Sequence, residues 1–308
     1  MIENINIAIT NRCNLKCLHC SIWQERPKKD ISLSLIKKIL SSKSLAKNPD
    51  ITLTGGEPFL HKDYLKIIKS IIETKPCALK TISTNGTLKS EILSFLKKTS
   101  PKLSKDFQLH ISLDGINKHK KQRAVTSAKK ILNTIDAVQK SYPNLTIKIK
   151  FTITTLNYDD IIPTYNFAKS GNIGFKIKLA ENAKNYTNKL KPAPVIFSGD
   201  EKKSILKDLL LIYKDYRKSG ERKEASFIKD TMEFLVGAKK KFLCKTPFER
   251  IFVMPDGSVY SCIHFEKIGN IKSTGLTKIL KSAEARSIRE KIKRNGCNRC
   301  VSYHGYQI

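Results

Sequence analysis

The sequence predicts an α/β protein: an open, partial (β/α)6 TIM-like barrel followed by a small C-terminal α+β unit made of a β-hairpin plus a helix. Three observations support this prediction. Short apolar or alternating runs are followed by segments with helical spacing, which is typical of parallel βα units. Six such strands occur by about residue 180, too few for a closed eight-stranded barrel. Beyond them the pattern changes to that of a hairpin.

The six strand–helix units follow one another closely along the chain. Strands are predicted to begin at Ile5 and to cover residues 51–54, 79–83, 107–113, 145–153 and 173–179. Apolar residues with helical spacing predict helices around residues 35–40, 65–72, 92–96, 128–138 and 161–165. Because sites in such folds lie at the carboxyl ends of the strands, the chemically active residues should come directly after each strand.

The remainder of the chain predicts two further regions. Lys191-Pro192-Ala193-Pro194 is interpreted as a linker, and residues 201–241 have a helical pattern. A turn at residues 255–257 joins two short apolar runs, which predicts a hairpin. A helix with apolar residues from Leu276 to Ala283 is expected to end before Gly296. The predicted domains are a barrel over 1–195, a helical linker over 196–243 and a C-terminal unit over 244–308.

Composition limits the class of protein. The 308 residues are 40% hydrophobic, which is enough for a packed core and excludes disorder as the main state. No run of about 18 apolar residues occurs, and the first residues lack the basic and apolar regions of a signal peptide. We therefore expect a soluble cytoplasmic protein without membrane contact.

The net charge of +31 has two interpretations. An acidic partner such as RNA, a phosphorylated metabolite or an acidic peptide would explain it. A lysine bias spread over solvated helix faces would explain it equally. The charge comes from 48 Lys and only 10 Arg, and the lysines are dispersed. Since arginine suits phosphate and base recognition better, the second interpretation is favoured and nucleic acid is not.

Eight cysteines in a cytoplasmic chain indicate metal binding more than disulfides. Seven of them fall into two groups near the two ends of the chain. Cys77 stands alone before the third strand, so it should lie at the end of the barrel away from the chemistry. We interpret Cys77 as a small buried hydrophobic residue.

The first cysteine group, Cys13-x3-Cys17-x2-Cys20, comes directly after the first strand. Thiolates are suitable ligands for iron-sulfur clusters or zinc, and three of them leave one iron of a four-iron cluster without a protein ligand. The alternative is a zinc site with His19 as the fourth ligand. Closed zinc sites usually have two separated ligand pairs, so the cluster is the preferred interpretation.

Three more motifs come after later strands: Gly55-Gly56-Glu57-Pro58, Ser83-Thr84-Asn85-Gly86 and Ser112-Leu113-Asp114-Gly115. With the cysteine triplet, they resemble the radical S-adenosylmethionine (radical SAM) superfamily in residues 5–180. The resemblance implies that Cys13, Cys17 and Cys20 hold a catalytic [4Fe-4S] cluster whose open iron is chelated by SAM. An electron from the cluster would then cleave SAM to a 5′-deoxyadenosyl radical, which takes a hydrogen atom from the substrate.

The resemblance also implies which residues contact SAM. The two glycines would allow close approach of its methionyl end, and Glu57 would offset the ammonium charge. Arg123 matches an arginine near the SAM carboxylate, the alternative being an ordinary solvated helix start. The complete set of cofactor-binding residues is Gly55, Gly56, Glu57, Pro58, Asn85, Ser112, Asp114 and Arg123.

The second cysteine group consists of Cys244, Cys262, Cys297 and Cys300, and it resembles the SPASM/twitch extension of radical SAM enzymes. A full SPASM pattern has seven cysteines and two clusters, whereas four cysteines complete one auxiliary [4Fe-4S] cluster, as in the twitch arrangement. Such a closed cluster is expected to relay an electron. A zinc ribbon is the alternative, but it usually presents two short cysteine pairs, and only one pair here is short.

A molybdopterin-type enzyme of the superfamily fits these cysteines less well. Its auxiliary site has three cysteines with a different spacing, and its chain ends in Gly-Gly. This chain has four such cysteines and ends Gly305-Tyr306-Gln307-Ile308.

The alternation of side chains along the strands predicts which residues face the substrate. If the apolar residues face the outer helices, then His110, Ser112 and Asp114 face the barrel lumen. Four lysines should face it too, namely Lys148, Lys150, Lys176 and Lys178. Buried charges need partners, so we expect an anionic substrate unless this end of the barrel is open to water.

The sequence therefore predicts a radical SAM oxidoreductase or peptide maturase that acts on a peptide or an anionic small molecule. Its expected partners are SAM, the unknown substrate and a reductant such as flavodoxin or ferredoxin. Two alternatives remain at this point: an RNA-modifying radical SAM enzyme, and a zinc-dependent binding module without catalytic activity.

Overall fold

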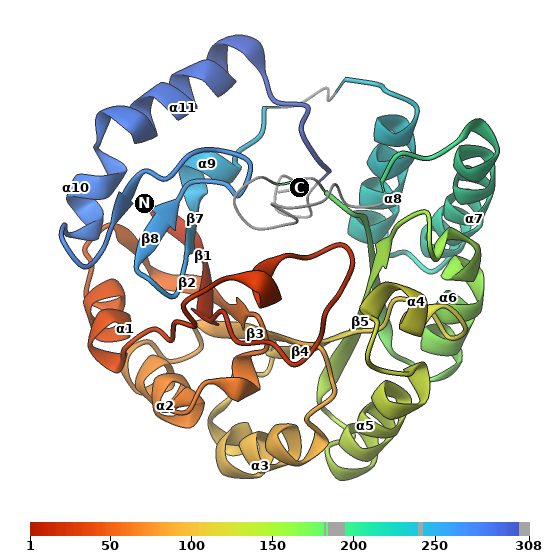
Figure 1. The fold of residues 1–308 in the computed structure, drawn as a ribbon, viewed down its shortest axis with the longest axis horizontal. Coiled ribbons are helices and arrows are strands. Elements are labelled where there is room, and N and C mark those ends of the chain that lie inside the picture. The colour runs from red at the N-terminus through yellow and green to blue at the C-terminus, as the bar shows by residue number, and fades with distance from the viewer. Residues whose placement is uncertain (182, 184–194, 240–242, 302–308) are drawn as a thin grey trace.

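The chain forms one curved sheet with helices on its outer face, in a computed structural model that describes residues 1–181, 183, 195–239 and 243–301 (Figure 1). Six strands pair in parallel in the order β6-β5-β4-β3-β2-β1. They are β1 (Ile2–Thr10), β2 (Leu45–Gly55), β3 (Leu79–Thr84), β4 (Gln108–Ser112), β5 (Thr146–Ile153) and β6 (Gly174–Leu179). The sheet stays open at β6, which confirms the predicted partial barrel.

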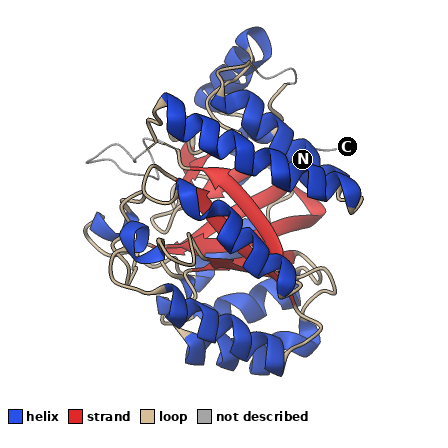
Figure 2. Cartoon of the chain, turned by 90° about the vertical axis from the view of Figure 1, so that its right-hand side faces the viewer, coloured by secondary structure: helices blue, strands red, loops and turns tan. Residues whose placement is uncertain are grey.

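Helices follow the strands and cover the outer face of the sheet, as Figures 1 and 2 show. Apolar residues at every second position of β1 (Ile5, Ile7 and Ile9) are fully buried against this helical layer. The residues between them face the lumen, because successive side chains of a strand point to opposite faces. The covering helices are α1 (Leu33–Leu40), α2 (Tyr64–Thr74), α3 (Lys89–Thr99), α5 (Ala128–Ser141) and α6 (Ile161–Ser170). The short helix α4 (His119–Arg123) lies between β4 and α5 and contacts the loop after β1.

The C-terminal hairpin continues the barrel sheet. Strand β7 (Arg250–Val253) pairs in parallel with β1, and β8 (Ser258–Tyr260) and β9 (Gly269–Asn270) follow antiparallel. The sequence predicted the hairpin but not its pairing, because the buried Ile251 and Val253 meet Ile5 and Ile7 across more than 240 residues of chain. The domain boundaries at 195 and 243 stay a prediction, and the sheet itself extends beyond them.

The helical segments differ from expectation in two places. The predicted 201–241 region contains two helices, α7 (Gly199–Lys218) and α8 (Arg222–Leu235). The single helix expected near Leu276 is divided into α10 (Leu276–Leu280) and α11 (Ala283–Asn295), because the Ser282 hydroxyl accepts a hydrogen bond from the Ala285 amide and starts a new helix. A four-residue helix, α9 (Thr246–Glu249), precedes β7. The predicted linker 191–194 and the terminal residues 305–308 lie outside the described residues.

No helix in the described ranges is both long and apolar enough to cross a membrane.

The prediction that Cys77 is buried is wrong. Its side chain is exposed, not buried, and its backbone φ is 66°. Cys77 lies in the tight turn between α2 and β3, where a left-handed conformation turns the side chain towards solvent. The prediction of its position is confirmed, since this turn leads into the amino end of β3.

Candidate active site

The loop after β1 brings three cysteines together at the carboxyl end of the sheet. Cys17 is buried, and Cys13 and Cys20 are half-buried. Burial raises the pKa of Cys13 to about 11 and that of Cys17 to about 12, and the charges of the neighbouring cysteines add to both shifts. Thiols in such surroundings ionise only when a cation stabilises the thiolates. The charge of Arg123 acts in this direction on Cys13 and Cys17, and the role of the three thiols as cluster ligands stays a prediction.

The spacing of ligand atoms separates a single metal ion from a cluster. Around one zinc ion with bonds of about 2.3 Å, sulfur atoms lie about 4 Å apart. Within the described residues, the only trio of His, Cys, Asp or Glu ligand atoms within 4.8 Å of one another is Glu181, His264 and Cys300. The Cys13, Cys17 and Cys20 sulfurs do not form such a trio with one another or with His19. The preformed geometry of a single-ion zinc site is therefore absent from this described loop.

Arg123 lies beside this cysteine loop and is buried, so the interpretation of it as a solvated helix start is wrong. Only 8% of its surface is exposed. Its Nε donates to Asp114 Oδ2 at 2.6 Å, and its Nη1 lies 3.8 Å from Cys17 Sγ. The other Asp114 oxygen accepts from the Thr152 amide at 2.8 Å. Burial raises the pKa of Asp114, but the charge and hydrogen bond of Arg123, together with the charges of His19 and His119, outweigh it and lower this pKa to about 2.

Gly55 and Gly56 join the end of β2 to the cysteine loop. The Gly56 amide donates to Thr10 O at 2.8 Å, and the Glu57 amide donates to Arg12 O at 2.7 Å. A Cβ at Gly55 would lie 2.3 Å from Thr10 O, and one at Gly56 would lie 2.0 Å from Arg12 O. Both positions require glycine because any Cβ atom would clash with a backbone carbonyl oxygen of residues 10–12. Their predicted contact with SAM stays a prediction.

Gly56→Ala is expected to displace the cysteine loop. The new methyl group cannot avoid Arg12 O, so the hydrogen bonds to Thr10 and Arg12 must break, at a cost of about 3 kcal/mol. Urea unfolding of the apo chain measures the loss of stability. Iron content after anaerobic reconstitution measures whether the displaced cysteine loop still binds its cluster. Gly199→Ala is the control, since nothing lies within 4 Å of that position. Equal stability of the two variants would contradict the prediction.

Glu57 is fully buried and holds the end of β3. Its oxygens accept from the Thr84 hydroxyl at 2.8 Å, the Asn85 amide at 2.7 Å and the Phe59 amide at 3.4 Å. Burial raises its pKa to about 7 in spite of these donors. Pro58 follows as the first residue of a short 3-10 helix, Pro58–Leu60, where its missing N–H costs nothing. The predicted contact of Glu57 with the SAM ammonium stays a prediction.

Asn85 and Ser112 differ in their surroundings. Asn85 donates to the Asn14 side chain at 2.8 Å and accepts from the Thr87 hydroxyl, so it ties the β3 loop to the cysteine loop. Ser112 is paired in register with Lys150 at the end of β4. Its half-buried hydroxyl has no hydrogen-bond partner among the residues that the structure describes. Ser112 is therefore better placed than Asn85 to bind a ligand.

The second cysteine group comes together from three segments: Cys244 before α9, Cys262 after β8, and Cys297 and Cys300 after α11. Burial raises the pKa of Cys262 to about 11, and the charges of Cys244, Glu181 and Cys297 raise it further. No zinc-like trio of cysteine sulfurs occurs in this part of the described chain. Four thiols are the number that one four-iron cluster needs, so this group stays the predicted ligand set of the auxiliary cluster.

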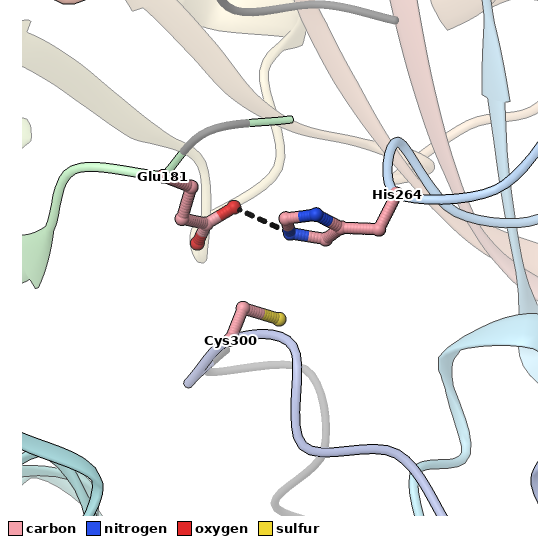
Figure 3. Close-up of side chains that lie close together, drawn as sticks. All are labelled: Glu181, His264 and Cys300. Carbon is pink, nitrogen blue, oxygen red and sulfur yellow. Dashed lines mark hydrogen bonds and ion pairs between the residues drawn. The ribbon is translucent and has the colours of Figure 1, made fainter. Parts of the chain in front are cut away.

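Sequence reasoning missed Glu181 and His264, which lie next to Cys300 (Figure 3). Two signals could have found them. Glu181 follows β6 at the carboxyl end of the sheet, where site residues are expected, and His264 comes two residues after Cys262.

The lumen lysines lie where strand alternation predicts. Burial, together with the charges of Lys178 and Lys176, lowers the pKa of Lys150 to about 7, and burial beside Lys148 lowers that of Lys176 to about 8. Lys148 lies 3.9 Å from Glu224 of α8, a partner that the sequence did not reveal. Lys150 and Lys178 have no ion-pair or hydrogen-bond partner within the described ranges.

Arg250 on β7 adds a cation that the sequence analysis also missed. It is 6% exposed, and its Nη2 donates to Asn4 Oδ1 at 3.0 Å. Its Nε and Nη1 have no partner among the described residues, and burial lowers its pKa to about 9. Its charge acts on Lys176, so it belongs to the same basic part of the lumen.

Comparison with protein families matches residues 7–168 to the radical SAM superfamily. The chain belongs to this superfamily. Residues 244–301 match the SPASM iron-sulfur cluster-binding domain. This radical SAM enzyme therefore uses SAM with a [4Fe-4S] cluster and carries a SPASM auxiliary cluster, and the zinc-dependent binding module is excluded.

Curated relatives and solved structures extend the comparison. The chain is similar to the GTP 3',8-cyclases of Campylobacter jejuni subsp. doylei (28% identity over 285 residues, 88% of this chain and 83% of the relative) and Aliarcobacter butzleri (26% over 310 residues, 96% and 90%). Its fold is similar to Streptococcus suis SuiB bound to S-adenosylmethionine (TM-score 0.67, 16% identity, 94% and 68% covered). It is also similar to native anSMEcpe with bound AdoMet and Cp18Cys peptide (0.66, 18%, 92% and 81%).

Proposed function

We propose that this radical SAM enzyme abstracts a hydrogen atom from an anionic small molecule, of the phosphorylated or nucleotide class, bound by the lumen cations. The observation that carries the proposal is the basic cluster of Lys150, Lys176, Lys178 and Arg250. Lys150 and Lys178 have no anionic partner among the described residues, and burial lowers the pKa values of Lys150, Lys176 and Arg250. A bound polyanion would favour the charged forms and accept hydrogen bonds from these side chains.

The chain's residues have separable roles in this chemistry. The bound cluster and SAM supply the 5′-deoxyadenosyl radical. Arg123, held by Asp114, keeps a positive charge next to Cys17. Lys150 is paired in register with Ser112, so the cations begin directly beside the predicted SAM contacts. We expect the sheet and its helices to keep bulk water away from the radical while it reacts with the substrate.

The comparisons support a nucleotide more than a peptide. The curated relatives act, by their names, on GTP, which is a polyanion. The structural likeness to SuiB and anSMEcpe is below 20% identity and supports the fold alone. An identity of 28% is too low to assign the cyclase reaction to this chain. The four auxiliary cysteines also fit a molybdopterin-type enzyme less well, because such an enzyme has three. We therefore propose the substrate class and not the cyclase product.

Net oxidation or bond formation completes the proposal, with the auxiliary cluster relaying an electron and a flavodoxin or ferredoxin as reductant. Cys77 is exposed at the opposite end of the barrel, so it is not placed to return a hydrogen atom to the substrate. RNA is the alternative substrate, and its affinity for the chain would depend steeply on salt concentration.

Lys150→Ala/Lys178→Ala tests the proposal with GTP and inorganic triphosphate as probes. Losing two charge-assisted contacts should weaken binding of both probes at least about tenfold, as measured by calorimetry on the reconstituted chain. Formation of 5′-deoxyadenosine without substrate should stay unchanged. Lys203→Ala is the control, because Lys203 lies on the surface of α7. Unchanged affinity in the double variant, or no binding by the unaltered chain, would refute the proposal.

A further inference from the structure

Glu181, His264 and Cys300 meet at one point beside the auxiliary cysteines (Figure 3). They come from the segment after β6, the loop after β8 and the segment after α11. His264 Nε2 lies 3.0 Å from Glu181 Oε2, and the two side chains are only 7% and 14% exposed. All three ligand atoms lie within 4.8 Å of one another. No other trio of this kind exists in the described part of the chain.

This geometry matches the surroundings of a single metal atom. Iron and zinc accept imidazole nitrogen, carboxylate oxygen and thiolate sulfur, at bond lengths of about 2.0 to 2.3 Å. Ligand atoms around such a metal are therefore about 3 to 4 Å apart. The other auxiliary cysteines offer sulfur only, so the Cys300 corner is chemically different from the corners at Cys244, Cys262 and Cys297.

Neighbouring contacts hold the trio in place. Arg299 Nη1 donates to His264 O at 2.7 Å, which joins the histidine loop to the Cys297–Cys300 segment. The Arg299 guanidinium also lies 4.7 Å from the centre of the Phe265 ring. His264 and Cys300 are thus connected through the side chain of Arg299, the residue before Cys300.

We propose that His264, oriented by its contact with Glu181, is a ligand of the metal corner at Cys300, so that this corner of the auxiliary site has a nitrogen ligand in addition to sulfur. The iron at this corner is then held by more than one protein ligand. Loss of the Cys300 sulfur leaves it bound, whereas loss of any other auxiliary cysteine does not.

Iron content and spectroscopy of reconstituted full-length variants test this inference. The unaltered chain should bind about eight irons, from two four-iron clusters. Cys300→Ala should keep about eight, whereas Cys300→Ala/His264→Ala should drop to about seven and show a three-iron cluster signal by electron paramagnetic resonance. Cys297→Ala is the matched control and should also drop to about seven, since Cys297 is not part of the trio. Cys300→Ser checks that any loss is not due to misfolding.

Histidine nitrogen provides a second readout. In protein labelled with 15N-histidine, pulsed electron paramagnetic resonance spectra of the reduced auxiliary cluster should show coupling to 15N. His264→Gln should abolish this coupling. The inference is overturned if Cys300→Ala loses iron as Cys297→Ala does, or if the spectra of the unaltered chain and His264→Gln coincide. These measurements involve no substrate, so their failure would leave the proposed function intact, and failure of GTP binding would leave this inference intact.

Discussion

Replacing Cys13, Cys17 and Cys20 together by alanine is expected to lower iron from about eight to about four per chain and to abolish 5′-deoxyadenosine formation on reduction with SAM. The three thiols come from one loop, and we expect them to be the protein ligands of the catalytic cluster. Iron analysis, the brown chromophore and product chromatography measure the effect on anaerobically reconstituted protein.

Cys77→Ala is the matched control for this triple variant. Cys77 is exposed in a turn at the opposite end of the barrel, so its removal should leave iron content and SAM cleavage unchanged. Retention of about eight irons, or of any SAM cleavage, in the triple variant would show that the loop does not hold the catalytic cluster.

Asp114→Asn is expected to cost about 3 to 5 kcal/mol of unfolding free energy, because it leaves the Arg123 charge buried without an anion. Urea unfolding of the apo chain at neutral pH measures this loss. Asp159→Asn removes a partly exposed ion pair with Lys118 at 3.1 Å and should cost less than about 1 kcal/mol. The prediction fails if both variants lose the same small amount.

The same pair has a defined pH dependence. The pKa of Asp114 is lowered to about 2 in the folded chain, below the usual value of 3.8. Its contribution to stability is therefore fully present above pH 3.8 and is lost as pH falls towards 2. Between pH 5 and 8 the difference between Asp114→Asn and the unaltered chain should be constant. A difference that changed in this range would mean that another group controls the pair.

Much of the barrel and of the first site followed from local patterns. Alternation along β5 and β6 placed Lys150 and Lys178 in the lumen, because side chains of a strand must point to opposite faces. The triplet of Cys13, Cys17 and Cys20 needed only its spacing and its place after β1. Cys77 shows the limit of such reasoning: cysteine is usually buried, but the turn conformation at this position decided otherwise.

The amino-acid sequence by itself determined that this chain is a partial barrel with two groups of metal-binding thiols, since strand period, turn residues and ligand spacing are properties of neighbouring positions. Only the tertiary structure decided that β7 completes the sheet beside β1, that Arg250 and Glu224 reach the lumen lysines, and that His264 and Glu181 meet at Cys300. Those contacts join residues tens to hundreds of positions apart. They depend on how whole elements pack, and no local pattern along the chain encodes that packing.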